Sequence, residues 1–278
     1  MPVPGLSLVG FMDHQAALTH LGDFCLPADK SPLALEAEWN AAKLKLGSSF
    51  PNAGQPDVQE LPSDAAAHIN ALMQQQWFQT YLSEPSLHIQ GFKLVEIDPL
   101  LAFQHSINKV RSTVHGTQLS SMPTLQGMLD ICLPIALPDE EYTLQQQANS
   151  LIIKARSLNL RIMRYGQFSK EFSGVFLGPG LPLAQVSYFN GRYYLTNGFH
   201  RALCLREAGV THIPCLFRTP LDPAMAGIGN GTFGLPLLEG ADPPTLGHFT
   251  QGRAYDVTMR LASRIITLTW SEWGVLDE

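Results

Sequence analysis

The stretch YYLTNGFHRALCLREAGVTHIPCLF, residues 193–217, constrains the fold of this chain more than any other part of its sequence. Its pattern predicts a strand, a tight turn, a helix, a second turn at Gly209 and a second strand. The fold must therefore combine strands with helices. The first turn also carries polar and glycine residues at the point where the helix begins, which indicates a candidate binding site.

The residues of this first turn suit the binding of a negatively charged group. Gly198 can adopt a turn conformation that residues with a side chain avoid, and Asn197 tolerates it nearly as well. The helix beginning at Phe199 or His200 directs unpaired N–H groups and its positive dipole end toward the turn. Arg201 adds a forked guanidinium, and His200 adds a donor that can carry a proton near neutral pH. The predicted phosphate or carboxylate site comprises Thr196, Asn197, Gly198, Phe199, His200 and Arg201. The competing interpretation is an ordinary Asn-Gly turn followed by an arginine that pairs with an acid elsewhere.

The first part of the chain has helical patterns. Ser31 as a cap, Pro32 at the first helical position and Gly47 as a stop predict a helix over 31–47. A second helix is predicted over 62–82, with apolar residues at helical spacing on one face, and the turn-rich residues between the two helices read as a loop. Residues 1–85 are therefore expected to form a helical N-terminal region.

Strand patterns enter beyond residue 86. A strand is predicted over 91–97, and Asp98 followed by Pro99 predicts a helix that begins there. A further helix is predicted over 139–157 from apolar residues on one face and acidic residues in its first turn. Strands are predicted over 158–165 and 183–189, and the Asn-Gly pair at 190–191 predicts a hairpin into the next strand.

The C-terminal part begins with a Gly/Pro-rich segment, residues 219–249, in which an ordered loop, flap or linker is expected. Within it GNGTFG, residues 229–234, matches the dinucleotide-binding glycine pattern by letter only, because no hydrophobic strand precedes it and no helix pattern follows. Alternating residues from Ile266 to Ser271 predict a half-buried final strand.

Composition limits the classes of function. The 278 residues carry a formal net charge of −6, and no run of Lys or Arg is present, so binding to nucleic acid through phosphates is not expected. Hydrophobic residues make up 45% of the chain, which is enough for a globular core. The four cysteines form no CxxC pair or zinc-like spacing, and no HExxH motif occurs, so no metal site is predicted. The N-terminus resembles neither a signal peptide nor a membrane span, which favours a cytoplasmic protein with no membrane contact.

Residues 190–217 resemble the signature of the ParB/sulfiredoxin superfamily, in which a strand leads to a Gly-x-His-Arg or Gly-x-Arg-Arg turn that opens a helix. The matching residues are Gly198, His200, Arg201, Gly209 and Pro214. Upstream, Pro99 and Gln104 in LVEIDPLLAFQ match the family's earlier box. The resemblance covers about residues 90–218. It implies an α+β fold, a small mixed sheet flanked by helices, with a nucleotide-phosphate pocket at the turn; residues 86–278 would form this domain.

Departures from the family pattern narrow the function that the resemblance implies. Sulfiredoxins have a catalytic Cys where this chain has Phe199, so thiol-based repair is not expected. Many relatives have Asp where this chain has Asn197, which weakens a role as a base or magnesium ligand. Neither the Gly-x-Arg-Arg form nor a helix-turn-helix after Phe217 is evident, so a ParB-like DNA-associated regulator is the last alternative.

Three hypotheses follow. The first is an enzyme that binds a nucleoside triphosphate such as ATP with magnesium and transfers or hydrolyses a phosphoryl group. In this hypothesis His200 and Arg201 hold the phosphates, and Gln104 orients a substrate or water. The second is a non-catalytic module that holds a nucleotide or anionic metabolite, while the N-terminal helices engage a protein partner. The third is a purely structural interaction protein.

Overall fold

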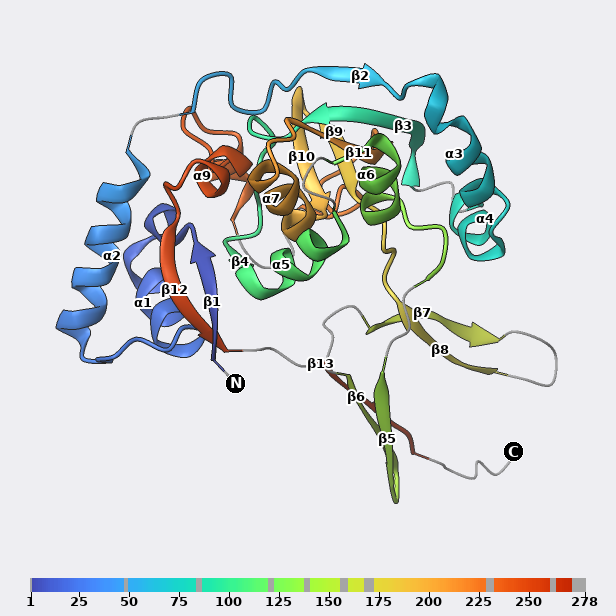
Figure 1. The fold of residues 1–278 in the computed structure, drawn as a ribbon. Coiled ribbons are helices and arrows are strands. Elements are labelled where there is room, and N and C mark those ends of the chain that lie inside the picture. Colours follow the sequence, from blue (N-terminus) through green and yellow to red (C-terminus); the bar gives the residue numbers. More distant parts are fainter. Residues whose placement is uncertain are drawn as a thin grey trace. The chain divides into compact units, whose positions relative to one another are not determined.

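The computed structural model describes residues 2–47, 50–83, 87–119, 123–137, 141–155, 160–167, 173–228, 233–260 and 264–271. The chain divides into two compact units (Figure 1). The first comprises residues 1–136 and 183–260, and the second comprises residues 137–182 and 261–278. The fold is α+β, as the sequence predicts.

The main sheet of the first unit has the strand order β10-β9-β11-β3-β2. These strands are β10 (Arg192–Asn197), β9 (Gln185–Phe189), β11 (His212–Arg218), β3 (Ile89–Glu96) and β2 (Val58–Glu60). The β11 strand pairs parallel with β9 and antiparallel with β3, so the sheet is mixed. The predicted strand–turn–helix–strand over 193–217 is confirmed, because α7 (Phe199–Glu207) connects β10 to β11. The α6 (Leu125–Cys132) and α7 helices lie on one face of this sheet (Figure 1).

A smaller sheet joins distant parts of the first unit. Its order is β12-β1-β4, with β12 (Tyr255–Arg260), β1 (Pro2–Ser7) and β4 (Ser106–Asn108). The α1 (His14–Asp23) and α2 (Pro32–Leu46) helices share a buried apolar cluster that includes Val9, Leu21 and Ala42. Residues 1–85 thus belong to the same compact unit as residues 86–136 and 183–260. The N-terminal segment contributes a strand, and that strand pairs with residues 255–260 and 106–108 of the same unit.

Local helix signals in the N-terminal part are largely confirmed. The α2 helix has Ser31 as its cap, with a side chain that accepts from the Ala34 N–H, and it ends before Gly47 at a φ of 68°. The predicted helix over 62–82 is broken instead. It consists of η2 (Ser63–Ala65), α3 (Ala66–Met73) and α4 (Gln76–Leu82), because Gln75 is extended with a ψ of 126°.

The helix predicted to begin at Asp98 is wrong. Leu100, Leu101 and Ala102 are fully buried. The Leu100 N–H makes a single turn bond to the Ile97 carbonyl, but the next two N–H groups donate to the carbonyls of Tyr193 and Pro244, so no helix continues from there. The carboxylate of Asp98 accepts from Arg206 instead of capping a helix. The helix in this region is α5 (Lys109–Gln118), and its cap is Asn108. Tertiary burial of an apolar segment here outweighs a local capping signal.

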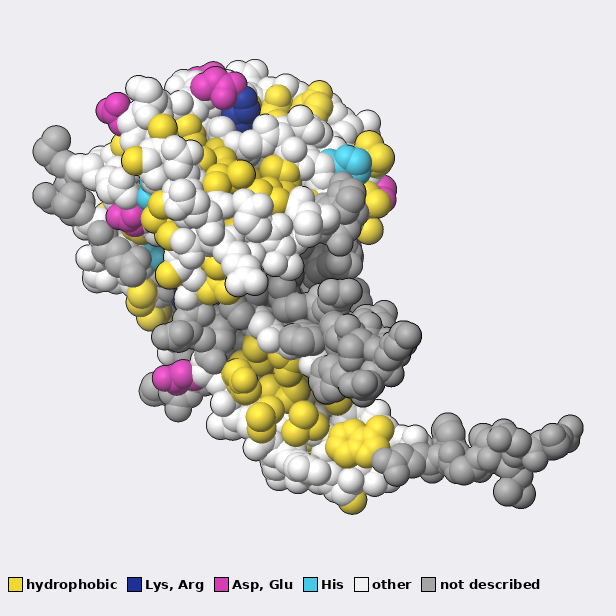
Figure 2. Space-filling view, turned by 90° about the vertical axis from the view of Figure 1, so that its right-hand side faces the viewer, with side chains coloured by type: hydrophobic (Ala, Val, Ile, Leu, Met, Phe, Trp, Pro, Cys, Tyr) yellow, Lys and Arg dark blue, Asp and Glu magenta, His cyan; other side chains and the backbone are white. Residues whose placement is uncertain are grey.

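The second unit is built from strands. Its three-stranded sheet has the order β13-β6-β5, with β13 (Arg264–Thr269), β6 (Ser150–Ala155) and β5 (Tyr142–Gln147), and β7 (Leu160–Gln167) pairs with β8 (Ser173–Pro179). The final strand is confirmed. The predicted helix over 139–157 is wrong: Ile153 and Ala155 are buried at alternate positions, and Ile266 of β13 lies opposite Ile153. Hydrophobic side chains gather over one face of this sheet (Figure 2).

The Gly/Pro-rich segment is ordered where the structure describes it. It contains α8 (Leu235–Leu238) and α9 (Leu246–Thr250), and Ile228, Phe233 and Leu238 belong to the main core. Residues 229–232 of the rejected glycine motif lie outside the described residues. A short helix, η1 (Val9–Phe11), follows β1 at the other end of the chain. The segments 9–24 and 233–238 come together at the pocket described below.

Candidate functional site

Gly198 shapes the turn that opens α7. It is the cap residue of the helix and adopts a φ of 111°, a conformation that favours glycine. The residues before it are held by the main sheet and its neighbour. The Thr196 hydroxyl donates to the Gln185 carbonyl at 3.2 Å, and the Asn197 amide donates to the Leu183 carbonyl at 2.8 Å. Gly198 itself is buried, and a Cβ placed on it would lie 3.2 Å from the Cβ of Ala184.

Arg201 points into the protein rather than out of the turn. Its side chain is buried, and its Nη1 lies 3.5 Å from the Ile131 carbonyl oxygen and 3.4 Å from that of Cys132. These carbonyls belong to the last residues of α6, where the helix dipole is negative and attracts a cation. Arg201 therefore joins the end of α6 to the start of α7.

His200 and Gln104 also make internal contacts. The His200 Nε2 accepts from the backbone N–H of Asn108 at 3.2 Å, so that nitrogen carries a lone pair. Burial, with Arg111 nearby, lowers the pKa of His200 to about 3, which keeps the ring neutral and unsuited to carrying protons near pH 7. The Gln104 amide donates to the Ser106 carbonyl. Among the contacts of the described residues, none joins Gln104 to residues 196–201.

One feature of the predicted anion site is retained. Within the described part of the chain, the backbone N–H groups of Phe199 and His200 have no hydrogen-bond acceptor. Such N–H groups at the first turn of a helix are the donors that phosphate and carboxylate groups use. The phenyl ring of Phe199 is buried and packs edge-on against Phe103 at 5.5 Å between ring centroids.

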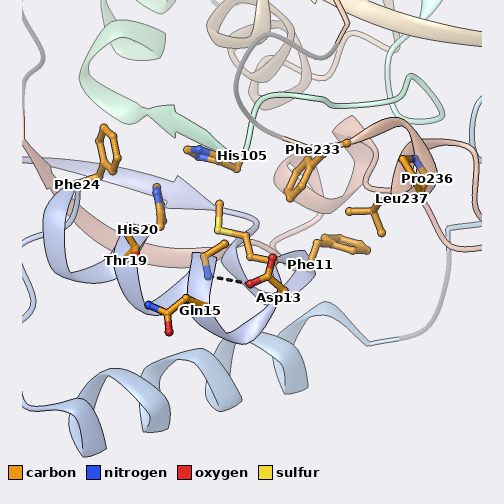
Figure 3. A pocket seen from close by; sticks show the side chains of 13 residues that line it. Phe11, Asp13, Gln15, Thr19, His20, Phe24, His105, Phe233, Pro236 and Leu237 are labelled. Atoms are coloured by element: carbon orange, nitrogen blue, oxygen red, sulfur yellow. Dashed lines mark hydrogen bonds between the residues drawn. The ribbon is translucent and has the colours of Figure 1, made fainter.

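The first unit also contains a pocket that the sequence analysis did not identify. It has a volume of about 740 Å³ and opens between α1 and the segment that leads into α8 (Figure 3). Three phenyl rings line it, those of Phe11, Phe24 and Phe233. His20 from α1 and His105 from the segment before β4 line it as well. Apolar side chains with a few polar groups are typical of small-molecule sites.

The two histidines belong to a hydrogen-bonded cluster, which we call the Ser–His cluster: Ser7, His20, His105 and Ser106. The imidazole rings of His20 and His105 lie 4.3 Å apart between centroids. The Nε2 of His20 is 3.2 Å from the hydroxyl oxygens of both Ser7 and Ser106. The two hydroxyl oxygens are 3.1 Å apart, and the Nδ1 of His105 is 3.1 Å from that of Ser106. The Ser7 hydroxyl also donates to the backbone carbonyl of His105 at 3.3 Å.

Burial keeps both imidazoles of the Ser–His cluster neutral. It lowers the pKa of His20 to about 4. Burial, together with the neighbouring His20, lowers the pKa of His105 to about 3. A group buried away from water and close to a second basic group resists gaining charge. At neutral pH the pocket therefore presents uncharged imidazole rather than imidazolium.

This pocket is not evident from the sequence, because the pairing of distant strands assembles its polar wall. Ser7 of β1 lies directly opposite Ser106 of β4 in the small sheet, although 98 residues separate them. A strand pattern over residues 2–7 together with a serine at its end would have been the only local signal. The pairing of β1 with β4 joins segments far apart in the sequence, and the hydrophobic periodicity of each strand does not reveal its partner.

Comparison of the chain with family models, with curated proteins and with solved structures found no match. The resemblance to the ParB/sulfiredoxin superfamily therefore stays a prediction. Over the described residues, no group of three or more His, Cys, Asp or Glu side chains is placed to hold a metal ion. In the same residues, no helix combines the length and the apolar character needed to cross a membrane. All four cysteines are buried and free.

Proposed function

We propose that the chain binds a small molecule with a largely apolar body in the pocket lined by Phe11, Phe24, Phe233, His20 and His105. The pocket carries this proposal, because a volume of about 740 Å³ holds a ligand of drug-like size and its rings supply apolar contact. The Phe24 ring is 58% exposed and stacks on His20 at 5.6 Å between centroids. An exposed aromatic ring at the rim of a pocket gains from being covered by a ligand.

The low pKa values of the two histidines and the positions of the two serines in the Ser–His cluster favour ligand binding over catalysis. A general base works best when its pKa lies near the working pH, and burial holds the pKa values of His20 and His105 near 4 and 3. Ser7 and Ser106 are buried and do not line the pocket, so neither hydroxyl is placed to attack a ligand there. The residues of the pocket are therefore suited to holding a ligand rather than to reacting with it.

The test of this function is a ligand screen with a blocking variant. We expect small aromatic probes such as phenol, indole and toluene to raise the melting temperature and to shift amide resonances of residues 11–24. Ala16 is exposed and lines the pocket, so Ala16→Trp fills it and removes these shifts. His14→Trp, on the same helix but outside the pocket lining, serves as the matched control and retains them. Absence of any such shift in the unmodified protein at millimolar probe refutes the function.

A second candidate function is the binding of a phosphate-bearing metabolite or nucleotide at the turn before α7. The N–H groups of Phe199 and His200, which have no acceptor among the described residues, favour it, as does the left-handed Gly198 before them. We propose in this case that the main mixed sheet corresponds to the core of the ParB/sulfiredoxin fold and that the site binds without turnover. The internal contacts of His200 and Gln104 favour the non-catalytic alternative over a magnesium-dependent phosphotransferase.

Calorimetry separates this second candidate from the first. The probes are inorganic phosphate and ATP, each with and without magnesium. Binding of ATP that survives Ala16→Trp, which blocks only the pocket, supports a separate anion site at the turn. ATP turnover would support the phosphotransferase alternative, and no heat of binding for either anion contradicts the second candidate.

A further inference from the structure

We infer that the pocket selects uncharged ligands that carry an O–H or N–H group, which donates a hydrogen bond to the Nε2 of His105. The inference deepens the proposed function and rests on it. It specifies the chemical class of the ligand: phenols, aromatic N–H heterocycles and alcohols with an apolar body.

The argument begins with the two hydroxyl groups of the Ser–His cluster, each of which has one proton. A backbone carbonyl can only accept, so the 3.3 Å contact from Ser7 to the His105 carbonyl uses the Ser7 proton. The 3.1 Å contact between the two hydroxyl oxygens must then use the proton of Ser106. Each hydroxyl group therefore donates its one proton in one of these two contacts and can only accept in every other contact.

The tautomers of the two histidines follow from this count. The Nε2 of His20, 3.2 Å from both hydroxyl oxygens, must carry the proton that those oxygens share. The Nδ1 of His105, 3.1 Å from the Ser106 oxygen, must also carry a proton. We assign these protons because no other arrangement makes all five contacts of the cluster hydrogen bonds. Any alternative leaves two oxygen or nitrogen lone pairs facing each other in a buried site.

A neutral imidazole has one N–H, so the remaining nitrogen of each ring has a lone pair. For His105 this nitrogen is Nε2. His105 is only partly buried and lines the pocket, and its Nε2 makes no hydrogen bond within the described residues. The corresponding Nδ1 of His20 is buried and has no partner among those residues. The pocket therefore offers a ligand the acceptor of His105, while the acceptor of His20 is buried behind its surface.

The charge of the pocket wall points to the same ligand class. Among the described residues that line the pocket there is no Lys or Arg, and Asp13 is the one acidic residue. An anionic ligand would meet lone pairs and a carboxylate without a compensating cation, which costs binding energy. An uncharged donor with an aromatic or aliphatic body fits both the phenyl rings and the His105 acceptor.

Matched pairs of probes test the inference. Indole and 1-methylindole differ in one N–H, as phenol and anisole differ in one O–H. We expect the donor of each pair to bind the unmodified protein about ten-fold more tightly, the effect of about one hydrogen bond. In His105→Phe, which keeps a ring but removes the acceptor, the ratio is expected to fall to about one. The surface variant His14→Phe keeps the original ratio.

The outcomes separate the inference from the function. If all four probes bind and the members of each pair bind equally to the unmodified protein, the inference is wrong and the proposed function stands. If no probe binds, the proposed function itself fails. Should His105→Phe not fold, the ¹⁵N resonances of the His105 ring in the unmodified protein decide directly. A protonated Nδ1 with an unprotonated Nε2 supports the inference, and the opposite tautomer overturns it.

Discussion

His248 provides a quantitative test of how burial controls the histidines of this protein. It is buried at the first turn of α9, and its Nδ1 lies 3.1 Å from the backbone N of Thr245, from which it accepts a hydrogen bond. The ring packs edge-on against Phe11, one of the rings of the pocket, at 5.0 Å between centroids. Burial lowers the pKa of His248 from 6.5 to about 4. Protonation would place an unhydrated charge in the core and remove the lone pair that caps α9.

The magnitude follows from linkage between protonation and folding. Between pH 6.5 and pH 4 the unfolded chain binds a proton at His248 that the folded protein does not, so stability falls as pH falls. Each pH unit below 6.5 costs about 1.4 kcal/mol for such a group. From pH 7.5 to pH 5.0 this one histidine should lower the free energy of unfolding by about 2 kcal/mol.

The variant His248→Gln isolates this contribution. Glutamine at the third helical position can still accept from the cap residue but does not titrate. We expect the loss of unfolding free energy between pH 7.5 and pH 5.0, measured by urea titration, to be about 2 kcal/mol smaller in the variant than in the unmodified protein. Comparing each protein with itself removes the cost of the substitution at neutral pH. His14→Gln, at an exposed position, is the control. An equal loss in His248→Gln and the unmodified protein would show that His248 is not held neutral by burial.

Two further substitutions test the contacts at the two ends of α7. Gly198→Ala should lower the free energy of unfolding by about 2–4 kcal/mol in urea titration, because a φ of 111° strains alanine and its Cβ would lie 3.2 Å from Ala184. Gly252→Ala, at a φ of 73° with nothing within 4 Å of the new Cβ, should cost only about 1 kcal/mol, and an equal cost would refute the packing argument. Asp98→Asn should cost about 2–3 kcal/mol, since the carboxylate accepts from Arg206 at 2.9 and 3.0 Å and from Thr250 at 2.7 Å. The control is Glu60→Gln, which removes an exposed carboxylate paired with Lys93 and should change the free energy of unfolding by less than about 0.5 kcal/mol. If Asp98→Asn and Glu60→Gln had similar effects, the stabilising role of the Asp98 contacts would be contradicted.

The sequence by itself determined the features that depend on neighbouring residues. Ser31, Pro32 and Gly47 mark the helix that forms between them, and the Asn190-Gly191 pair makes the predicted hairpin with positive φ at both residues. Gly198 likewise opens the helix where its pattern predicts. Caps and tight turns are decided by the φ of one residue and by hydrogen bonds within four positions, so they can be read along the chain.

Tertiary structure alone decided which apolar segments pair as strands. The residues 139–157 have helical spacing, yet β6 pairs with β13 more than a hundred residues later and buries Ile153 against it. The Asp98 carboxylate likewise bonds to Arg206 rather than to a helix of its own. A short apolar run is compatible with the periodicity of a helix or of a strand, and the surface that buries it determines which of the two forms.

The candidate sites show the same division. The glycine and the helix start of the turn were evident in the sequence, but the direction of Arg201 depends on where the end of α6 lies. The pocket could not be predicted, because its histidines come from α1 and from the segment before β4 and are oriented by two serines on paired strands. A turn or a helix start depends on adjacent residues and can be predicted from them. A pocket forms between surfaces that meet only after the chain has folded.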